Sequence, residues 1–172
     1  LLADVDPDRP IDEYTLIGTH GSAAYRLDLN IVVDDRGHGI KKYGACVPDL
    51  TRRWAINHGY SLHDQLIMGV RFLHLEISLY ECEWCTIHSY KAGTLLEDIS
   101  EILRFVIMPG TKHFTLLYPQ LFRNKPEDMD CHGRTYLEAI AHILGRHHRF
   151  YQPHDTMRTY YNRVAIIDAA SV

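Results

Sequence analysis

The hydrophobic positions of the chain form short apolar runs that alternate with segments of helical periodicity. Runs rich in Val, Ile, Leu and Phe between turn residues are typical of strands buried on both faces. Segments with apolar residues three and four positions apart are typical of amphipathic helices. The runs predict strands over residues 14–18, 70–79, 86–88, 113–118 and 163–168, and the periodic segments predict helices over 62–67, 95–108 and 136–144.

Capping residues, glycines and prolines define the ends of these elements. Ser61 is expected to be the N-cap of the first helix, and Asp64 stands where its carboxylate can reach back to the Ser61 amide, as in a capping box. Gly69 and Gly145 end the first and third helices, because glycine readily takes the conformation that closes a helix. Pro119 is expected to end the strand before it, because proline cannot donate to a strand ladder.

The order of the elements is mostly alternating strand and helix, which favours a parallel sheet in an α/β fold, as a β/α barrel or a doubly wound sheet. A closed TIM-type barrel has eight strands and typically about 250 residues. The roughly five strands predicted in 172 residues therefore indicate a partial barrel. The missing strands come from the same polypeptide, from another chain, or not at all. The polar stretch 26–50, with Asp-Asp-Arg-Gly-His-Gly at 34–39, is interpreted as a loop.

Length and composition indicate one globular domain over residues 1–172, with 46% hydrophobic and 23% charged residues. The net charge of -4 gives no broad cationic field, so nucleic acid is not an expected partner. The basic clusters at 41–42, 52–53 and 146–149 are interpreted as solvated surface. No run approaches the ~18 apolar residues of a membrane-spanning helix. The first residue is Leu1 rather than Met, which favours a piece of a longer chain.

Two of the 12 histidines stand where predicted strands end. His20 follows the strand 14–18 after a Gly-Thr turn, and His88 ends the strand 86–88. Because the carboxyl ends of parallel strands share one rim of a sheet, we expect both imidazoles on that rim. Two imidazoles can divide the work of general base and general acid. Glu76, late on the intervening strand, is a candidate to orient an imidazole or to bind a metal.

Several motifs, in order along the chain, resemble the X domain of phosphatidylinositol-specific phospholipase C. The run Leu-Ile-Gly-Thr-His-Gly-Ser-Ala-Ala-Tyr at 16–25 is similar to the family motif Gly-(Ser/Thr)-His-(Asp/Asn)-Ser, which carries the first catalytic histidine. Ile87-His88 stands where the family has its second histidine. The resemblance runs from about Tyr14 to the end of the chain and is greatest to the X-domain-only branch. The segments 54–57, 61–66, 69–73, 95–99 and 114–117 continue it in the same order.

The resemblance implies a phospholipase C-like phosphodiesterase fold and a phosphoinositide or related phospholipid as substrate. In the family, the first histidine takes the proton of the inositol 2-hydroxyl and the second protonates the departing diacylglycerol oxygen. His20 would therefore be the general base and His88 the general acid. A Ca²⁺ ion or an arginine neutralises the charge that develops on the phosphate. We also expect Arg71 and Lys91 to bind substrate, and a phospholipid head group or a membrane surface to be the partner.

The sequence departs from the family pattern around the two histidines. Gly21 stands where the family has Asp or Asn, and Tyr118 stands where a further carboxylate is common. His-Leu-Glu at 74–76 replaces the acid-x-acid of metal-dependent members and the Asp-x-Arg of bacterial members. Glu76 with His74 is therefore the expected site for Ca²⁺ or another divalent cation. A Ca²⁺ ion prefers six to eight oxygen ligands, whereas imidazole favours a softer ion.

Three functions stay open at this point. The first is a phosphodiesterase that acts on a phosphoinositide or related phospholipid. The second is a catalytically inactive domain that serves as a structural or interaction module of a larger protein or assembly, since a fold alone does not determine function. The third is a phosphodiesterase for another lipid, such as a sphingolipid, with Glu76 holding Mg²⁺. The altered positions around the histidines favour the second function, and the retention of both histidines favours an enzyme.

The cysteines offer a further candidate site. Cys82-x-x-Cys85 followed by His88 resembles half of a zinc site, which His74 or Cys131 would complete. The alternative is a pair of cysteines in a turn, oxidised or reduced. The pairing of the four cysteines, at positions 46, 82, 85 and 131, is left open.

Overall fold

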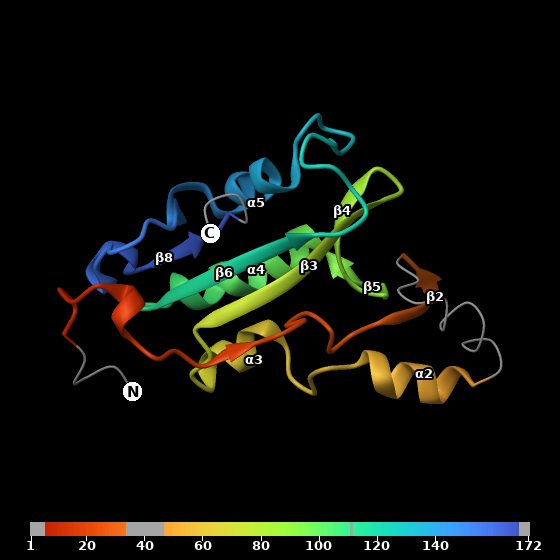
Figure 1. Ribbon diagram of the computed structural model, residues 1–172, viewed down its shortest axis with the longest axis horizontal. Helices are drawn as coiled ribbons and strands as arrows, with labels where there is room; N and C mark the ends of the chain where they lie inside the picture. Colours follow the sequence, from red (N-terminus) through yellow and green to blue (C-terminus); the bar gives the residue numbers. More distant parts are fainter. Residues whose placement is uncertain (1–5, 34–46, 111, 169–172) are drawn as a thin grey trace.

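The computed structural model describes residues 6–33, 47–110 and 112–168, apart from the side chains at 48, 49, 52 and 54. These residues form a mixed α/β fold around one eight-stranded sheet (Figure 1). The loop expected at 34–39, the basic pair at 41–42 and Cys46 lie outside the described residues.

The sheet combines a parallel part with an antiparallel part. The strands β1, β3, β6, β8 and β7 run parallel to one another. On the other side of β3, the strands β4, β5 and β2 follow in antiparallel pairs. The spatial order is β2-β5-β4-β3-β6-β8-β7, with β1 beside the start of β3. This sheet of described strands is open, which confirms the partial barrel. The strands are β1 (Gly18–Thr19), β2 (Asp28–Val32), β3 (Phe72–Tyr80), β4 (Glu83–His88), β5 (Tyr90–Thr94), β6 (Phe114–Leu121), β7 (His148–Phe150) and β8 (Arg163–Ile166).

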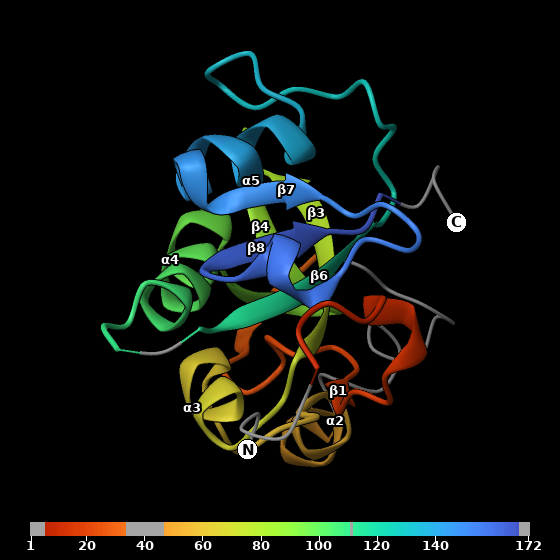
Figure 2. The same cartoon turned by 90° about the vertical axis from the view of Figure 1, so that its left-hand side faces the viewer.

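Three helices cover one face of the sheet. Helix α4 lies along the strands, and α3 and α5 pack on either side of it (Figure 2). The main hydrophobic core fills the space between these helices and β3, β4, β6 and β8. The helices are α2 (Pro48–Ala55), α3 (Leu62–Ile67), α4 (Leu95–Val106) and α5 (Tyr136–Leu144), and the 3₁₀ turns are η1 (Ile11–Glu13), η2 (Gly145–His147) and η3 (Met157–Tyr160).

The helix positions predicted from periodicity and capping residues are confirmed to within two residues. The hydroxyl of Ser61 accepts from the amide of Asp64 at 3.1 Å, as predicted for the N-cap of α3. The Asp64 carboxylate instead accepts from that same hydroxyl, at 2.8 Å, and not from the Ser61 amide. Complete capping boxes start α4 and α5, with Thr94 and Thr135 as the N-caps.

The direction of β4 differs from the prediction of parallel strands. β4 pairs antiparallel with β3 from Ile77–Thr86 to Tyr80–Glu83, so the two form a hairpin. The reason is the short connection: a turn of two residues, Glu81 and Cys82, joins the strands, whereas a parallel connection needs a dozen residues or more. His88 therefore reaches the site by folding back along β3.

Two further expectations need correction. Pro119 does not end its strand, because β6 continues to Leu121. The last pair between β6 and β8 is Leu117–Ile166. Beyond it, β6 pairs only with β3 among the described strands, so Pro119 lies at an edge of the sheet, where proline is tolerated. The polar stretch 26–50 is not all loop, since it contains β2 and the start of α2.

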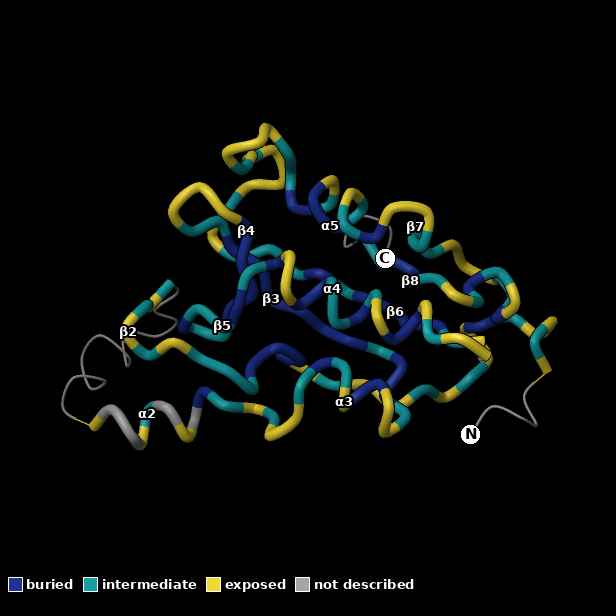
Figure 3. The backbone as a smooth tube through the Cα atoms, turned by 180° about the vertical axis from the view of Figure 1, so that it is seen from behind, coloured by how far each residue is buried: buried dark blue, intermediate teal, exposed yellow. Residues whose placement is uncertain are grey.

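Burial is greatest along β3 and β4, which lie inside the molecule for most of their length (Figure 3). The β3–β4 turn and the segment between β6 and α5 are exposed and lie side by side. Within the described part of the chain, no helix has the length and apolar character that a bilayer crossing requires.

Candidate functional site

The first histidine is positioned by the short strand β1. Its residues Gly18 and Thr19 pair in parallel with Phe72 and Leu73 of β3, so His20 follows at the level of His74. Successive side chains of a strand point to opposite faces. His74 and Glu76 therefore share one face of β3 with Phe72, and the packed helices lie on the other.

A chain of hydrogen bonds runs from His20 through His74 to Gln120. His20 Nδ1 and His74 Nδ1 are 2.6 Å apart, and the two rings stack with centroids 4.6 Å apart. His74 Nε2 lies 2.7 Å from the amide oxygen of Gln120. The backbone amide of Gly21 donates to His74 Nδ1 at 3.3 Å.

For each ring in its singly protonated form, these contacts determine which nitrogen carries the proton. The Gly21 amide can only donate and the Gln120 oxygen can only accept, so His74 accepts at Nδ1 and donates from Nε2. His20 must then donate from Nδ1 to His74, which leaves the lone pair of its Nε2 for another partner. The arrangement orients His20 as a carboxylate would, but without adding a negative charge.

His88 is held in the same tautomer by the last residue of α2, Ala55. Its Nδ1 lies 2.8 Å from the carbonyl oxygen of Ala55, which can only accept, so the proton is on Nδ1. Its Nε2 is 3.4 Å from the side-chain amide nitrogen of Asn57. The same Asn57 nitrogen donates to the carbonyl of His20 at 3.4 Å, and the His58 ring donates to that carbonyl at 2.9 Å. Asn57 thus links the two histidines.

Gly21 explains how Asn57 can reach this place. Gly21 has a φ of +56°, and a Cβ built on it would lie 2.5 Å from the Asn57 amide nitrogen and 3.3 Å from Cδ2 of His88. A side chain at position 21 and the present position of Asn57 therefore exclude each other. The polar group that the family resemblance leads one to expect at position 21 is absent, and an amide from position 57 fills that space.

The rings of His20, His74 and Tyr118 form one side of an open hollow. The His74 and Tyr118 ring centroids are 5.5 Å apart, and Phe72 stacks next to Tyr118 at 6.5 Å. The hollow has a volume of about 500 Å³ and is lined by His20, Phe72, His74, Tyr118 and Gln120, among others. Tyr118 thus contributes a flat aromatic surface at the position where a carboxylate was expected from the family pattern.

The structure gathers one possible cation site from the described residues. His20, His74 and Glu76 each offer a ligand atom, and these atoms lie within 4.8 Å of one another. Two imidazole nitrogens and one carboxylate oxygen fit a divalent transition metal, whereas the six to eight oxygens that Ca²⁺ prefers are not supplied by this set. Both nitrogens of His74 already have hydrogen-bond partners, so a cation would replace one of those bonds.

Arg71 is not placed for the substrate-binding role expected from the sequence. Its guanidinium lies on the helix side of the sheet, 4.8 Å from the Phe105 ring centroid, and donates to the carbonyls of Leu66 and Val70 at 2.8 and 2.7 Å. The physical reason is strand alternation, which sends residue 71 to the face opposite His74. Burial lowers the pKa of Arg71 from its usual range.

Lys91 is also directed away from the two histidines. Its ammonium group lies 3.9 Å from a carboxylate oxygen of Glu83 and 5.6 Å from the centroid of the Tyr80 ring. Both partners stand beside the β3–β4 turn, at the opposite end of β4 from His88. The prediction that Lys91 binds substrate thus has no support in this geometry.

The cysteines do not form the zinc site considered above. Cys85 is buried and donates to the carbonyl of Ser78 at 3.2 Å, and burial raises its pKa to about 12. Among the described residues, the cluster of three or more possible metal ligands contains no cysteine. Cys82, Cys85 and Cys131 are all free thiols.

Sequence reasoning missed the residues that support the two histidines. Asn57 and Gln120 belong to segments far from both histidines in sequence, and each contacts the site only because the chain folds back. Asn57 lies in the segment 54–57, which resembles the family, whereas Gln120 lies beyond the similar segment 114–117. Nothing in the pattern around either residue distinguishes its amide from a surface polar group.

Comparisons with known proteins agree with this fold. A PI-PLC X-box domain-containing protein of Dictyostelium discoideum is 26% identical over 141 residues, which cover 81% of this chain and 18% of that protein. No protein-family model matches the sequence. The matched residues span less than a fifth of the length of the Dictyostelium discoideum protein.

Solved structures of bacterial enzymes share the fold. Phosphatidylinositol-specific phospholipase C of Listeria monocytogenes superposes with a TM-score of 0.65 at 12% identity, over 96% of this chain and 54% of that one. The Staphylococcus aureus enzyme gives 0.63 at 12% identity, over 98% and 51%. A calcium-dependent phosphoinositol-specific phospholipase C from Pseudomonas sp. gives 0.58 at 11% identity, over 95% and 58%.

The chain thus has a phospholipase C-like phosphodiesterase fold, in the form of an open, partial β/α barrel. The resemblance to the phosphatidylinositol-specific phospholipase C X-domain family, first indicated by the motifs around His20 and His88, is confirmed by the relative and by the solved structures. The chain spans about half the length of the bacterial enzymes, as a partial barrel does.

Proposed function

We propose that this domain cleaves the phosphodiester of a phosphoinositide or a related phospholipid, with His20 as general base and His88 as general acid. The observation that carries the proposal is the link through Asn57, whose amide contacts the carbonyl of His20 and the ring of His88. Both rings use Nδ1 for an internal hydrogen bond, which leaves Nε2 of His20 for substrate. Nε2 of His88 contacts the Asn57 amide at 3.4 Å, and substrate would replace this contact.

The proposed mechanism divides the proton transfers between the two rings. His20 Nε2 accepts the proton of the attacking hydroxyl, and the positive charge that develops on the ring is stabilised by the Nδ1 hydrogen bond to His74. Gln120 holds His74 in the tautomer that can accept this bond. His88 acts as general acid in its doubly protonated form: Nδ1 keeps its bond to the Ala55 carbonyl, and Nε2 gives its proton to the departing oxygen, which leaves the neutral ring.

The proposal includes a divalent cation at His20, His74 and Glu76, for which the donor atoms suit Zn²⁺ or Mn²⁺ better than Ca²⁺. When bound, such an ion supplies positive charge next to the phosphate. The ion and the His20–His74 hydrogen bond compete for the same imidazoles. Added metal should inhibit the domain if the reaction uses the hydrogen bond, and it should activate the domain if the reaction uses the ion.

We also propose that residues 1–172 are the first half of a β/α barrel, completed by the same polypeptide or by another chain. The open sheet and the half-length match to the bacterial enzymes support this division. A phospholipid head group or a membrane surface is then the partner of the site.

One observation favours the alternative of a catalytically inactive module. Arg71 and Lys91, the cations expected to meet the phosphate, are both occupied elsewhere, while Glu76 brings a carboxylate to the site. Without a bound cation, none of these three residues can neutralise the negative charge that develops on the phosphate in the transition state. Such neutralisation is worth several kcal/mol in sites of this kind.

The test is release of inositol phosphate from phosphatidylinositol vesicles, with sphingomyelin vesicles as the second substrate. Wild type is assayed in EDTA and with Ca²⁺, Mn²⁺ or Zn²⁺, beside His20→Ala, His88→Ala and a control at an exposed histidine, His132→Ala. We expect activity in wild type and His132→Ala and a loss of at least about 100-fold in the other two variants.

The outcomes separate the candidate functions. Choline phosphate release from sphingomyelin alone would identify the other lipid class. Wild-type activity that does not exceed His20→Ala under every condition, in protein with an unchanged circular dichroism spectrum, would leave the non-catalytic module as the function.

A further inference from the structure

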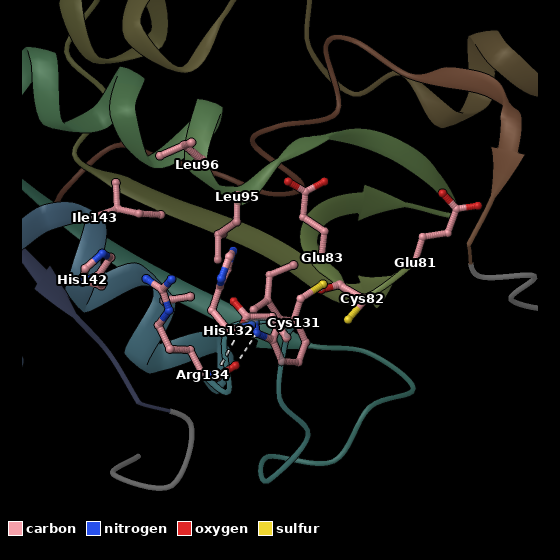
Figure 4. A pocket seen from close by; sticks show the side chains of 13 residues that line it. Glu81, Cys82, Glu83, Leu95, Leu96, Cys131, His132, Arg134, His142 and Ile143 are labelled. Atoms are coloured by element: carbon pink, nitrogen blue, oxygen red, sulfur yellow. Dashed lines mark hydrogen bonds between the residues drawn. The ribbon is translucent and has the colours of Figure 1, made fainter.

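Two exposed thiols lie together at the far end of the β3–β4 hairpin from His88. Cys82 is the second residue of the turn, and Cys131 belongs to the segment between β6 and α5. The backbone amide of Cys131 donates to the carbonyl of Cys82 at 3.0 Å, and the Cys131 thiol donates to the same carbonyl at 2.8 Å. Figure 4 shows both side chains at the edge of one cavity. We propose that Cys82 and Cys131 form a reversible disulfide.

The backbone geometry fits such a bond. The single backbone hydrogen bond of 3.0 Å from the Cys131 amide to the Cys82 carbonyl keeps the two Cα atoms within about 7 Å of each other. Disulfides span Cα separations of about 4.4–6.8 Å, so the two residues need little backbone movement. A hydrogen bond with Cys131 raises the pKa of the Cys82 thiol.

Both segments are held in place by contacts outside the cysteines. Asp130 accepts from the amides of His132 and Arg134 at 2.8 and 3.0 Å, which shapes the chain around Cys131. The indole of Trp84, two residues after Cys82, donates to the carbonyl of Arg134 at 2.9 Å. The two thiols are therefore presented to each other by anchored backbone.

The third described cysteine is excluded from this pair. Cys85 is 0% exposed, and its thiol is directed to the carbonyl of Ser78 within the hairpin. A fully buried thiol is out of reach of an oxidant in solution, and this burial also raises the pKa of Cys85 to about 12. Cys85 is thus an internal control for the reaction.

A low-molecular-weight disulfide such as oxidised glutathione is the oxidant of this reaction. The thiolate of one cysteine attacks a sulfur of the oxidant, a mixed disulfide forms, and one glutathione thiolate leaves. The second cysteine then loses its proton and attacks the protein sulfur of the mixed disulfide. The Cys82–Cys131 bond forms, and the second glutathione thiolate leaves. Two protein thiols are oxidised, one glutathione disulfide is reduced to two thiols, and the reverse exchange restores the pair.

The disulfide would change the hairpin and the cavity beside it. The cavity has a volume of about 500 Å³, and Cys82 and Cys131 lie in its wall with Glu83, Asp130, His132 and Arg134. A bond between the two cysteines fixes the position of the turn relative to the segment before α5. It also closes a loop of about 50 residues, which restricts the unfolded chain.

The experiment exposes the purified chain to oxidised glutathione and then maps tryptic peptides without reduction. We expect one cross-linked pair, residues 72–91 with the peptide that contains Cys131, in wild type and in Cys85→Ser. The pair is absent in Cys82→Ser and in Cys131→Ser. The melting temperature of the oxidised wild type and Cys85→Ser should rise by on the order of 10 °C over the reduced form, and dithiothreitol should reverse the shift.

Three results overturn the proposal. The first is a cross-link that survives Cys82→Ser, which would assign Cys85. The second is a bond from either cysteine to Cys46. The third is a product in which Cys82 and Cys131 each stay as separate glutathione adducts after prolonged incubation. All four proteins are first compared in reduced form by circular dichroism, so that misfolding of a serine variant is recognised before oxidation.

Discussion

At the scale of single residues, the position of the Asn57 side chain depends on a glycine at position 21. The Asn57 amide stands 2.5 Å from the place where any side chain at position 21 would begin, and Gly21 has a left-handed φ of +56°. The sequence alone identified Gly21 as a departure from the family pattern, but it contained no signal that position 57 fills the same space. Such compensation depends on contacts between distant segments, so periodicity and motifs cannot reveal it.

Gly21→Ala should lower the free energy of unfolding by roughly 1–3 kcal/mol, because alanine is strained at this φ and its Cβ displaces Asn57. Urea unfolding measures the change. The control is Gly133→Ala, which has a φ of +70° and open space around its Cβ, and which should lose only the backbone part.

The double variant Gly21→Ala/Asn57→Ala separates the clash from the strain. If the clash matters, the two substitutions together cost less than the sum of their separate costs. Strict additivity within about 0.5 kcal/mol would contradict the proposed exclusion between the two positions.

Secondary-structure elements were predictable to the extent that their signals are local. The helices α3, α4 and α5 follow from apolar spacing and capping residues, which lie within a few positions of one another. The direction of β4, the extension of β6 past Pro119 and the existence of β2 and β7 depend on pairing with strands elsewhere in the chain. Propensity cannot supply such information.

Helix α4 carries a buried carboxylate that links it to strand β4 and to the segment before β2. Asp98 is 0% exposed, accepts from the Thr86 hydroxyl of β4 and accepts from Arg26 at 2.6 Å. Burial raises the pKa of Asp98 to about 6 from 3.8, although the bonds to Thr86 and Arg26 lower it. The folded state therefore binds a proton more tightly than the unfolded chain does.

Stability should consequently fall as the pH rises from about 4 to above 6, by up to about 3 kcal/mol from this group. The side chain introduced by Asp98→Asn cannot titrate. The free energy of unfolding of the variant should therefore increase relative to that of wild type as the pH rises through this interval. Urea unfolding at pH 4, 5, 6 and 7 measures the difference, with Glu127→Gln, at an exposed carboxylate, as control. Parallel pH profiles for wild type and Asp98→Asn would show that Asp98 has an ordinary pKa.

At the scale of the whole molecule, the open sheet is stabilised chiefly from one face. The helices α3, α4 and α5 cover that face, and β3 lies at the centre, paired with β1, β4 and β6. The sequence predicted this partial barrel from the number of strands and the chain length. It could not predict the antiparallel extension through β4, β5 and β2, because short connections permit a hairpin only once the strand ends are known.

Leu75→Ala should lower the free energy of unfolding by about 2–5 kcal/mol, because Leu75 is fully buried at the centre of β3 and its loss leaves a cavity. Leu96→Ala, at a side chain of α4 that is 59% exposed, should change it by less than about 0.5 kcal/mol. The comparison is made by thermal and urea unfolding of the two variants. A small effect at Leu75 would mean that the face packed against the helices does not hold the sheet together.

The hairpin of β3 and β4 also limits how this family of chains can vary in length. One residue added to each strand moves the turn outward and leaves the Ile77–Thr86 pair unchanged. One residue added to a single strand shifts the pairing and turns every side chain beyond it to the other face. Insertions and deletions in the paired part of this hairpin should therefore come as one residue in each strand. Such a change moves the turn and leaves His88 in its place.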